Sequence, residues 1–237
     1  MQMNHADFAR SPALRASLKR GLARQAIAAA DRCRPDLPGL IRMAAGLRPN
    51  PKGVERMAAR IKAHPGVTRV TAARDGRSLT FIARLVRMVD ARVGGDTVFH
   101  ETGLIYLRCR VGMMGQGLSF ELSAVGFCCH ALERLVERSD LPLDRALLPQ
   151  VDAEAQQILR SWDSGSGIVE DGDDYHAART EGVWAGSHDL MALDPDWNLT
   201  NRCGRMPVFS ARTFLSPAEM RPTVWLRWKN DPACRMT

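Results

Sequence analysis

The sequence lacks long apolar runs and repeats, and each absence excludes a class of protein. Within its 237 residues no uninterrupted apolar run approaches the roughly 18 residues that a membrane-spanning helix needs, so we expect no membrane partner. There is no internal repeat and no low-complexity tract, which excludes a repeat architecture. Residues 1–21 contain no continuous apolar region of the kind that secretory signals have. We therefore expect a cytoplasmic protein.

Paired cysteine motifs are also missing. No C-x-x-C occurs, and the cysteines are spread too widely to resemble a disulfide framework or a structural zinc site. We therefore expect reduced thiols, no metal site and no cofactor. The six cysteines are Cys33, Cys109, Cys128, Cys129, Cys203 and Cys234.

Lysine is scarce, and the positive charge is unevenly distributed. The net charge is +7, but residues 1–90 hold 18 lysines and arginines against 6 acidic residues, whereas residues 91–237 hold 15 against 20. A concentrated basic surface is typical of nucleic-acid binding, because it neutralises phosphates and releases counterions. The alternative is a solvated, arginine-rich surface without a ligand.

The basic charge falls on two predicted amphipathic helices. Helix 11–33 begins with Ser11 as N-cap and Pro12 at the first helical position. A second helix, from residue 50, ends before Pro65-Gly66, and one short helical turn is expected around 38–46. If the partner is a nucleic acid, we expect RNA rather than DNA. The residues expected to bind it are Arg15, Lys19, Arg20, Arg24, Arg56, Arg60 and Lys62.

After residue 66 the pattern predicts an α+β domain. The dipeptide Asp75-Gly76 indicates a hairpin turn, and short strands continue to about residue 125. We thus predict a basic helical segment, 1–65, followed by a domain, 66–237, with a mainly antiparallel sheet and helices packed on one face. The further elements expected are helices at 127–139, 143–149 and 152–161, a loop at 163–176, a strand or hairpin at 182–193, and a strand, short helix and strand within 205–228.

The segment GFCCHALERLVERSD, residues 126–140, carries the main candidate site. His130, Arg134 and Arg138 share one helical face at i, i+4 and i+8, and aliphatic residues occupy the other. The two arginines are like charges without a full internal partner, so an anion such as phosphate would satisfy both. The helix dipole and Arg134 should lower the pKa of His130, as a general base requires.

Three other interpretations of this segment remain open. The His-Arg-Arg stripe could be an ordinary solvated face. Cys128 and Cys129 are expected to be packing thiols, although a metal site or a cysteine nucleophile with a histidine base is an alternative. His100 and His176 are interpreted as surface residues.

The stretch HALERLVERS, followed by DLPLDRAL, resembles the His-Ala-x-x-Arg-x-x-x-Arg helix of small metal-independent toxin ribonucleases, in the fold group of the RelE/ParE-like and colicin-type enzymes. VFSARTFLS, residues 208–216, resembles their late strand with an Arg/Thr pair. The resemblance implies that His130 acts as base or acid and that Arg134 and Arg138 hold the phosphate. It further implies that Arg212 assists them, that Thr213 or Ser216 donates a hydrogen bond, that His188 is a second acid/base group, and that Trp184 stacks on a base.

The sequence therefore favours a metal-independent endoribonuclease of toxin or mobile-element type, with an antitoxin or another protein as a further partner. The alternative is a non-catalytic nucleic-acid-binding or accessory protein that uses the basic N-terminal helices. A third hypothesis is an interaction protein without a nucleic-acid role. The sequence leaves open whether the chain is an enzyme.

Overall fold

The structure is a computed structural model and describes residues 12–93, 96–114, 117–142, 144–197, 199 and 204–230. The fold is α+β, as predicted. Its helices are α2 (Pro12–Arg32), α3 (Leu37–Ala45), α4 (Pro51–Lys62), α5 (Cys129–Arg138), α6 (Leu148–Ser164), the 3₁₀ turn η1 (Pro195–Trp197) and α7 (Pro222–Asn230). Its strands are β1 (Val67–Ala72), β2 (Ser78–Val93), β3 (Asp96–Met114), β4 (Gly117–Cys128), β5 (Ile168–Glu170), β6 (Asp173–Ala177), β7 (Val183–Ala192) and β8 (Arg205–Leu215).

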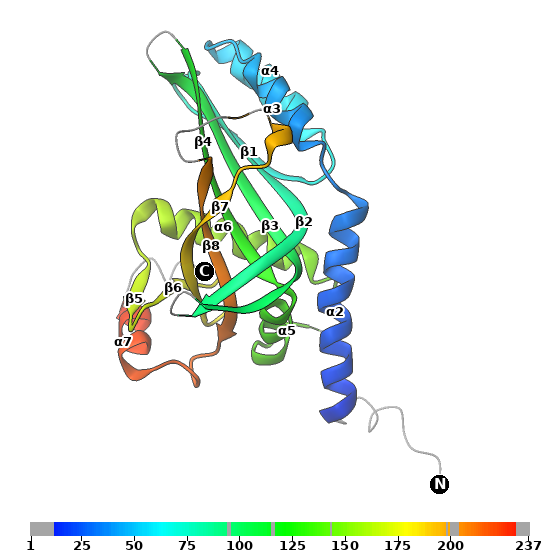
Figure 1. Cartoon of the computed structure of the whole chain (residues 1–237), viewed down its shortest axis with the longest axis vertical. Coiled ribbons are helices and arrows are strands. Elements are labelled where there is room, and N and C mark those ends of the chain that lie inside the picture. Colours follow the sequence, from blue (N-terminus) through cyan, green and yellow to red (C-terminus); the bar gives the residue numbers. More distant parts are fainter. Residues whose placement is uncertain are drawn as a thin grey trace.

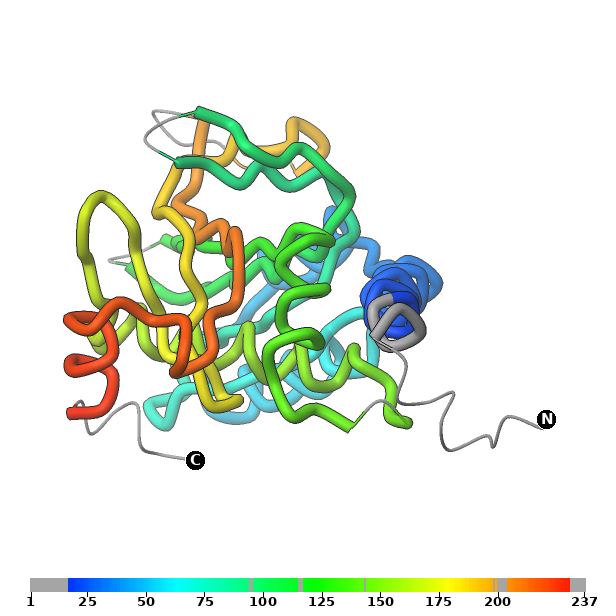
Figure 2. The backbone as a smooth tube through the Cα atoms, turned by 90° about the horizontal axis from the view of Figure 1, so that it is seen from below, coloured from blue at the N-terminus to red at the C-terminus, as the bar shows by residue number. Residues whose placement is uncertain are grey.

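The strands form one mainly antiparallel sheet in the order β1-β2-β3-β4-β8-β7-β6-β5. Each neighbouring pair is antiparallel except β4 and β8, which are parallel and pair Val125 with Phe209. The long strands run beside α2 in Figure 1, and the sheet curls, as the end-on view of Figure 2 makes clear. In Figure 2 helix α5 lies between α2 and strands β7 and β8.

The predicted hairpin at Asp75-Gly76 is confirmed. β1 pairs with β2 in antiparallel register, and the turn between them is closed by a hydrogen bond from the Gly76 N–H to the Ala73 carbonyl, 3.0 Å. Gly76 has φ +64, and a Cβ at this position would lie 2.7 Å from the backbone nitrogen of Pro51. Glycine is therefore required both for the left-handed backbone and for the close approach of α4.

Several predicted elements are wrong in the C-terminal half. Of the predicted helix 143–149, residue 143 lies outside the described residues, 144–147 are not helical, and only 148–149 are helical. They belong to α6, which includes the predicted helix 152–161, because Pro149 stands in the first turn, where no N–H is needed. The predicted loop 163–176 contains the end of α6, β5 and most of β6. The final strand is helix α7, which starts at Pro222, and the residues before it form a turn rather than the predicted short helix.

One hydrophobic core spans the predicted boundary at Pro65-Gly66. It contains Ala26 of α2 and Ile61 of α4 together with Leu107 of β3 and Phe127 of β4, each at most 3% exposed. The boundary therefore marks a change of secondary structure within a shared core. Among the described helices, none is both long and apolar enough to cross a membrane.

Candidate functional site

Helix α5 starts directly after β4, and two side chains satisfy N–H groups of its first turn. The Ala131 N–H donates to the Cys128 sulfur at 3.4 Å, and the His130 N–H donates to Oε1 of Glu101 at 2.6 Å. Both contacts occupy N–H groups that a helix leaves without an internal partner. Glu101 comes from β3, so the sequence around α5 contained no signal for it.

Helix α5 is amphipathic, as the sequence predicted. Leu132, Leu135 and Val136 are buried, whereas His130, Arg134 and Arg138 are partly exposed on the other face. Helix α5 packs against β8 and α2, which lie on either side of it in Figure 2. Arg138 of its polar face contacts the end of β8. The stripe is thus carried on a rigid element rather than on a loop.

His130 is held on two sides. Its ring stacks on Phe99 with centroids 4.5 Å apart, and Nε of Arg134 donates to Nε2 of His130 at 3.3 Å. The pKa of His130 is lowered from 6.5, first by burial and then by the charge of Arg134, with Glu101 and Glu133 acting in the opposite direction. The predicted direction is correct, but burial rather than charge is the larger cause, and the ring is neutral at pH 7.

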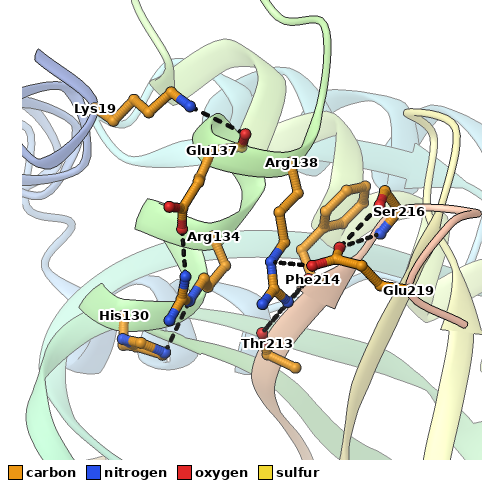
Figure 3. A network of polar contacts seen from close by, with 9 residues as sticks. All are labelled: Lys19, His130, Arg134, Glu137, Arg138, Thr213, Phe214, Ser216 and Glu219. Atoms are coloured by element: carbon orange, nitrogen blue, oxygen red, sulfur yellow. Dashed lines mark hydrogen bonds and ion pairs between the residues drawn. The ribbon is translucent and has the colours of Figure 1, made fainter. Parts of the chain in front are cut away.

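The arginines of the stripe have internal acidic partners, so the prediction that they lack them was wrong. Arg134 forms an ion pair with Glu137, one turn along the helix. Arg138 pairs through Nε with Oε1 of Glu219 at 2.9 Å. Figure 3 shows both pairs, with Arg138 extending from α5 toward Glu219. Glu219 follows β8, about eighty residues from Arg138 in the chain, which is why the pattern of the helix alone did not indicate it.

Arg138 also connects α5 to the end of β8. Its Nη1 donates to Oγ1 of Thr213 at 3.2 Å and to the carbonyl of Phe214 at 2.7 Å. Ser216 donates from its N–H and hydroxyl to Oε2 of Glu219, at 3.1 and 2.8 Å. The helix stripe and Thr213 therefore meet, as Figure 3 shows, and we call the group His130, Arg134, Arg138 and Thr213 the α5–β8 site.

Arg212 does not join this group. On β7 and β8, Gly186 pairs with Ala211, but the next residue, Ala185, pairs with Thr213. Arg212 is therefore left over as the extra residue of a β-bulge. Its guanidinium forms two hydrogen bonds to the carboxylate of Asp173, at 3.1 and 2.9 Å. Another bond, of 3.0 Å, runs to the carbonyl of Arg92. The side chain thus ties β8 to β6 and β2.

His188 lies elsewhere on the sheet. It pairs with Phe209, four positions before Thr213 along β8, which corresponds to about 13 Å of strand. Its Nε2 is 3.0 Å from Nε2 of His176, and His176 contacts the hydroxyl of Ser161 at 2.9 Å. His176 is only 2% exposed, so the interpretation as a surface residue was wrong.

Trp184 is fully buried, at 0% exposure, and its prediction as a stacking surface was wrong. The indole packs edge-on against Phe127 and Phe214, and its N–H donates to Oε2 of Glu154 at 3.1 Å. Glu154 is itself buried and accepts further bonds from the N–H groups of Arg179 and Thr180. Trp184 therefore anchors α6 to β7.

The thiols at the start of α5 are packing groups, as expected. Cys128 is buried and lies 3.8 Å from the carbonyl of Ala211, and Cys129 is half-buried beside Glu133. Burial raises the pKa of Cys128 to about 12 and that of Cys129 to about 11. Both thiols are protonated at pH 7, which disfavours a cysteine nucleophile. In the described part of the chain no three His, Cys, Asp or Glu side chains converge as metal ligands would.

The basic helices contribute unequally to this region. Lys19 on α2 donates to the carbonyl of Glu137 at 3.0 Å, so it caps the last turn of α5. Arg20 and Arg24 are exposed on the same helix, and the side chain of Arg15 lies outside the described residues. The α4 cations are also exposed, but Figure 1 places α4 and α5 at opposite ends of the molecule. The predicted α4 binding residues are Arg56, Arg60 and Lys62.

Comparison of the chain with protein-family models, curated proteins and solved structures found no match. Its function is therefore inferred from its own residues.

Proposed function

We propose that the chain is a metal-independent endoribonuclease of toxin or mobile-element type that acts at the α5–β8 site. The observation that supports this best is the 3.2 Å contact between Arg138 and Thr213. It joins the two segments that carry the resemblance, although 75 residues separate them in sequence. The same proposal includes a cytoplasmic location and an antitoxin or other protein partner.

The chemistry needs a base, a phosphate-binding cation and a leaving-group proton. Arg134 turns from Nε2 of His130 toward the phosphate, which frees the lone pair of that nitrogen. Neutral His130 then takes the proton of the RNA 2′-hydroxyl at Nε2, and the 2′-oxygen attacks phosphorus. Arg134 and Arg138 stabilise the negative charge, and Thr213 donates a hydrogen bond to a phosphate oxygen. The P–O5′ bond breaks, and the 5′-oxygen takes a proton from water. His188 on β7 is too far away to supply it, since its partner Phe209 lies about 13 Å along β8 from Thr213.

Glu137 and Glu219 oppose substrate binding in this arrangement. Each already neutralises one of the arginines that would hold the phosphate. A phosphodiester must therefore displace both carboxylates, and RNA binding involves an exchange of ion-pair partners. The free site is consequently weaker than a set of unpaired arginines would be.

Cleavage of RNA in EDTA by the wild type and His130→Ala tests the proposal. We expect His130→Ala to lose at least about 100-fold in rate, the usual contribution of a general base. Because the base is the neutral ring and its pKa is lowered, the rate should fall on acidification with a midpoint below 6.5. His64→Ala, a histidine next to α4, is the matched control and should cut normally. Equal cleavage by both variants would contradict the proposal.

A non-catalytic nucleic-acid-binding protein is the alternative, and one observation favours it. The exposed α4 cations Arg56, Arg60 and Lys62 form no ion pair within the described part of the chain, unlike Arg134 and Arg138. Under this alternative, replacing the three α4 cations by Gln weakens salt-dependent RNA retention, and no RNA is cut. Under the first proposal, replacing Arg134 and Arg138 by Gln has the larger effect on RNA binding.

A further inference from the structure

A second cationic site lies between α6 and the outer strands of the sheet. The cavity there measures about 190 Å³ and shares no residue with the α5–β8 site. Arg69 and Thr71 are two residues apart on β1 and so share one face, and Thr80 on β2 is the direct partner of Thr71. Gln156 and Arg160 approach from α6 at i and i+4.

The walls of this cavity are fixed. Asp152, one turn before Gln156 on α6, accepts two hydrogen bonds of 2.6 Å from Arg84 and one of 2.7 Å from Tyr106. Arg108 of β3 bonds the carboxylate of Asp163 at 2.7 Å. These contacts hold the helix against the strands, so the cavity is a preformed feature.

Arg69 and Arg160 have only neutral partners among the described residues. Arg69 donates to Oε1 of Gln156 at 2.9 Å, and Arg160 donates to the Gln156 carbonyl at 3.3 Å and to Oε1 of Gln157 at 3.0 Å. The lining carboxylate, Asp163, is engaged by Arg108.

The charges around the cavity also repel one another. The pKa of Arg160 is lowered by burial and by the nearby charges of Arg69 and Arg179. A bound anion would remove this repulsion and would satisfy guanidinium groups that now donate to amides and carbonyls.

We propose that this cavity binds a small phosphate-bearing ligand, held by Arg69 and Arg160 with the hydroxyls of Thr71 and Thr80 as further donors. Two guanidiniums and two hydroxyls, all donors, match the several acceptor oxygens of a phosphate. The cavity is below the roughly 300–1,000 Å³ of pockets for drug-sized ligands, so the phosphate group itself is the recognised part. This inference is independent of the proposed ribonuclease activity.

Titration calorimetry of the full chain with inorganic pyrophosphate tests the site. We expect wild-type binding and a loss of affinity of about ten-fold or more in Arg69→Gln and in Arg160→Gln, since each removes a charged hydrogen bond. Arg42→Gln removes an exposed arginine from α3 and is the matched control, which should bind as the wild type does.

The result that overturns the proposal is the absence of pyrophosphate binding, or equal affinity in Arg69→Gln, Arg160→Gln and Arg42→Gln. Competition by an RNA oligonucleotide without terminal phosphates identifies the source of the phosphate. Displacement of pyrophosphate supports occupation by an RNA backbone, and absence of displacement supports a free phosphate ligand. Because Arg134 and Arg138 hold the phosphate in the proposed α5–β8 site, replacing both by Gln should leave the pyrophosphate affinity of this cavity unchanged, which separates the two sites.

Discussion

At the scale of single residues, the main finding is that charged groups are satisfied by partners distant in sequence. Arg138 pairs with Glu219, Arg212 with Asp173, and the His130 N–H with Glu101. Periodicity reveals which residues share a helical face, so the His-Arg-Arg stripe was predictable. It cannot reveal which strand or turn lies opposite that face, so these acidic partners were missed.

Glu219→Gln tests whether Glu219 competes with RNA for Arg138. Gln keeps an acceptor for Ser216 but removes the charge that neutralises the guanidinium. We expect RNA affinity at low salt to rise several-fold. The reason is that RNA would no longer have to displace an ion pair, and a partly exposed ion pair stabilises by up to about 1 kcal/mol. Glu121→Gln, an exposed acid paired with Arg110, is the control. Unchanged affinity in Glu219→Gln would count against the α5–β8 site as an RNA contact.

His176 should make stability depend on pH. Burial, followed by the charge of His188, lowers its pKa from 6.5 to about 4. As pH falls, His176 therefore takes up a proton in the unfolded chain before it does so in the folded chain. The free energy of unfolding that the neutral ring contributes is fully present above pH 6.5 and is lost between pH 6.5 and 4. Between pH 7.5 and 5 we expect a loss of about 2 kcal/mol in the free energy of unfolding.

Chemical denaturation at those two pH values checks this expectation. His176→Phe should lose less stability on acidification than the wild type, because it carries no titrating ring. The control His64→Ala should keep the wild-type dependence. An identical pH dependence in His176→Phe and wild type would assign the effect to other groups.

At the scale of elements, local signals were reliable where one strong local rule decided the structure. The hairpin at Asp75-Gly76 and the amphipathic helix α5 were predicted for this reason. Helix α7 was not predicted, because Thr223, Val224 and Trp225 favour strands. The helix forms because Pro222 stands at its start and Val224 packs against Ile168 and Met220.

Helix α6 depends on one buried carboxylate. Glu154 is 0% exposed and accepts hydrogen bonds from Gln150, Arg179, Thr180 and Trp184. We expect Glu154→Ala to lower the free energy of unfolding by about 3 kcal/mol or more, because several buried donors would lose their acceptor. Urea denaturation measures this, with exposed Asp163→Ala on the same helix as the milder comparison. A loss below that of Asp163→Ala would contradict the assigned role.

At the scale of the whole molecule, the N-terminal helices and the sheet form one cooperative core. Ala23, Ala26 and Ala30 of α2 are at most 3% exposed, and they belong to the same buried cluster as Leu104 and Phe127. Charge in the sequence separated residues 1–65 from the rest, but charge reports the surface and not the core. The sequence predicted α2 as an amphipathic helix, but its pattern could not indicate that this face packs in the same core as the sheet.

Removal of residues 1–65 should therefore unfold the remaining chain. We expect circular dichroism to show no cooperative thermal transition for residues 66–237, since the sheet face under α2 and α4 would be exposed to water. A cooperative transition in that fragment would contradict a shared core. RNA binding by the basic helices should consequently be tested by substitutions rather than by truncation.

The parallel pairing of β4 with β8 has a consequence for the nascent chain. β8 is a central strand of the sheet, yet its residues, 205–215, leave the ribosome about eighty residues after those of β4. Until then β4 has an unpaired edge, and Arg138 lacks both Thr213 and Glu219. β4 and β8 are some eighty residues apart in sequence, which slows folding. The entropy cost of closing this long loop arises before the strand contacts form that offset it. The chain thus acquires its α5–β8 site only after the segment with Thr213 and Glu219 has been synthesised.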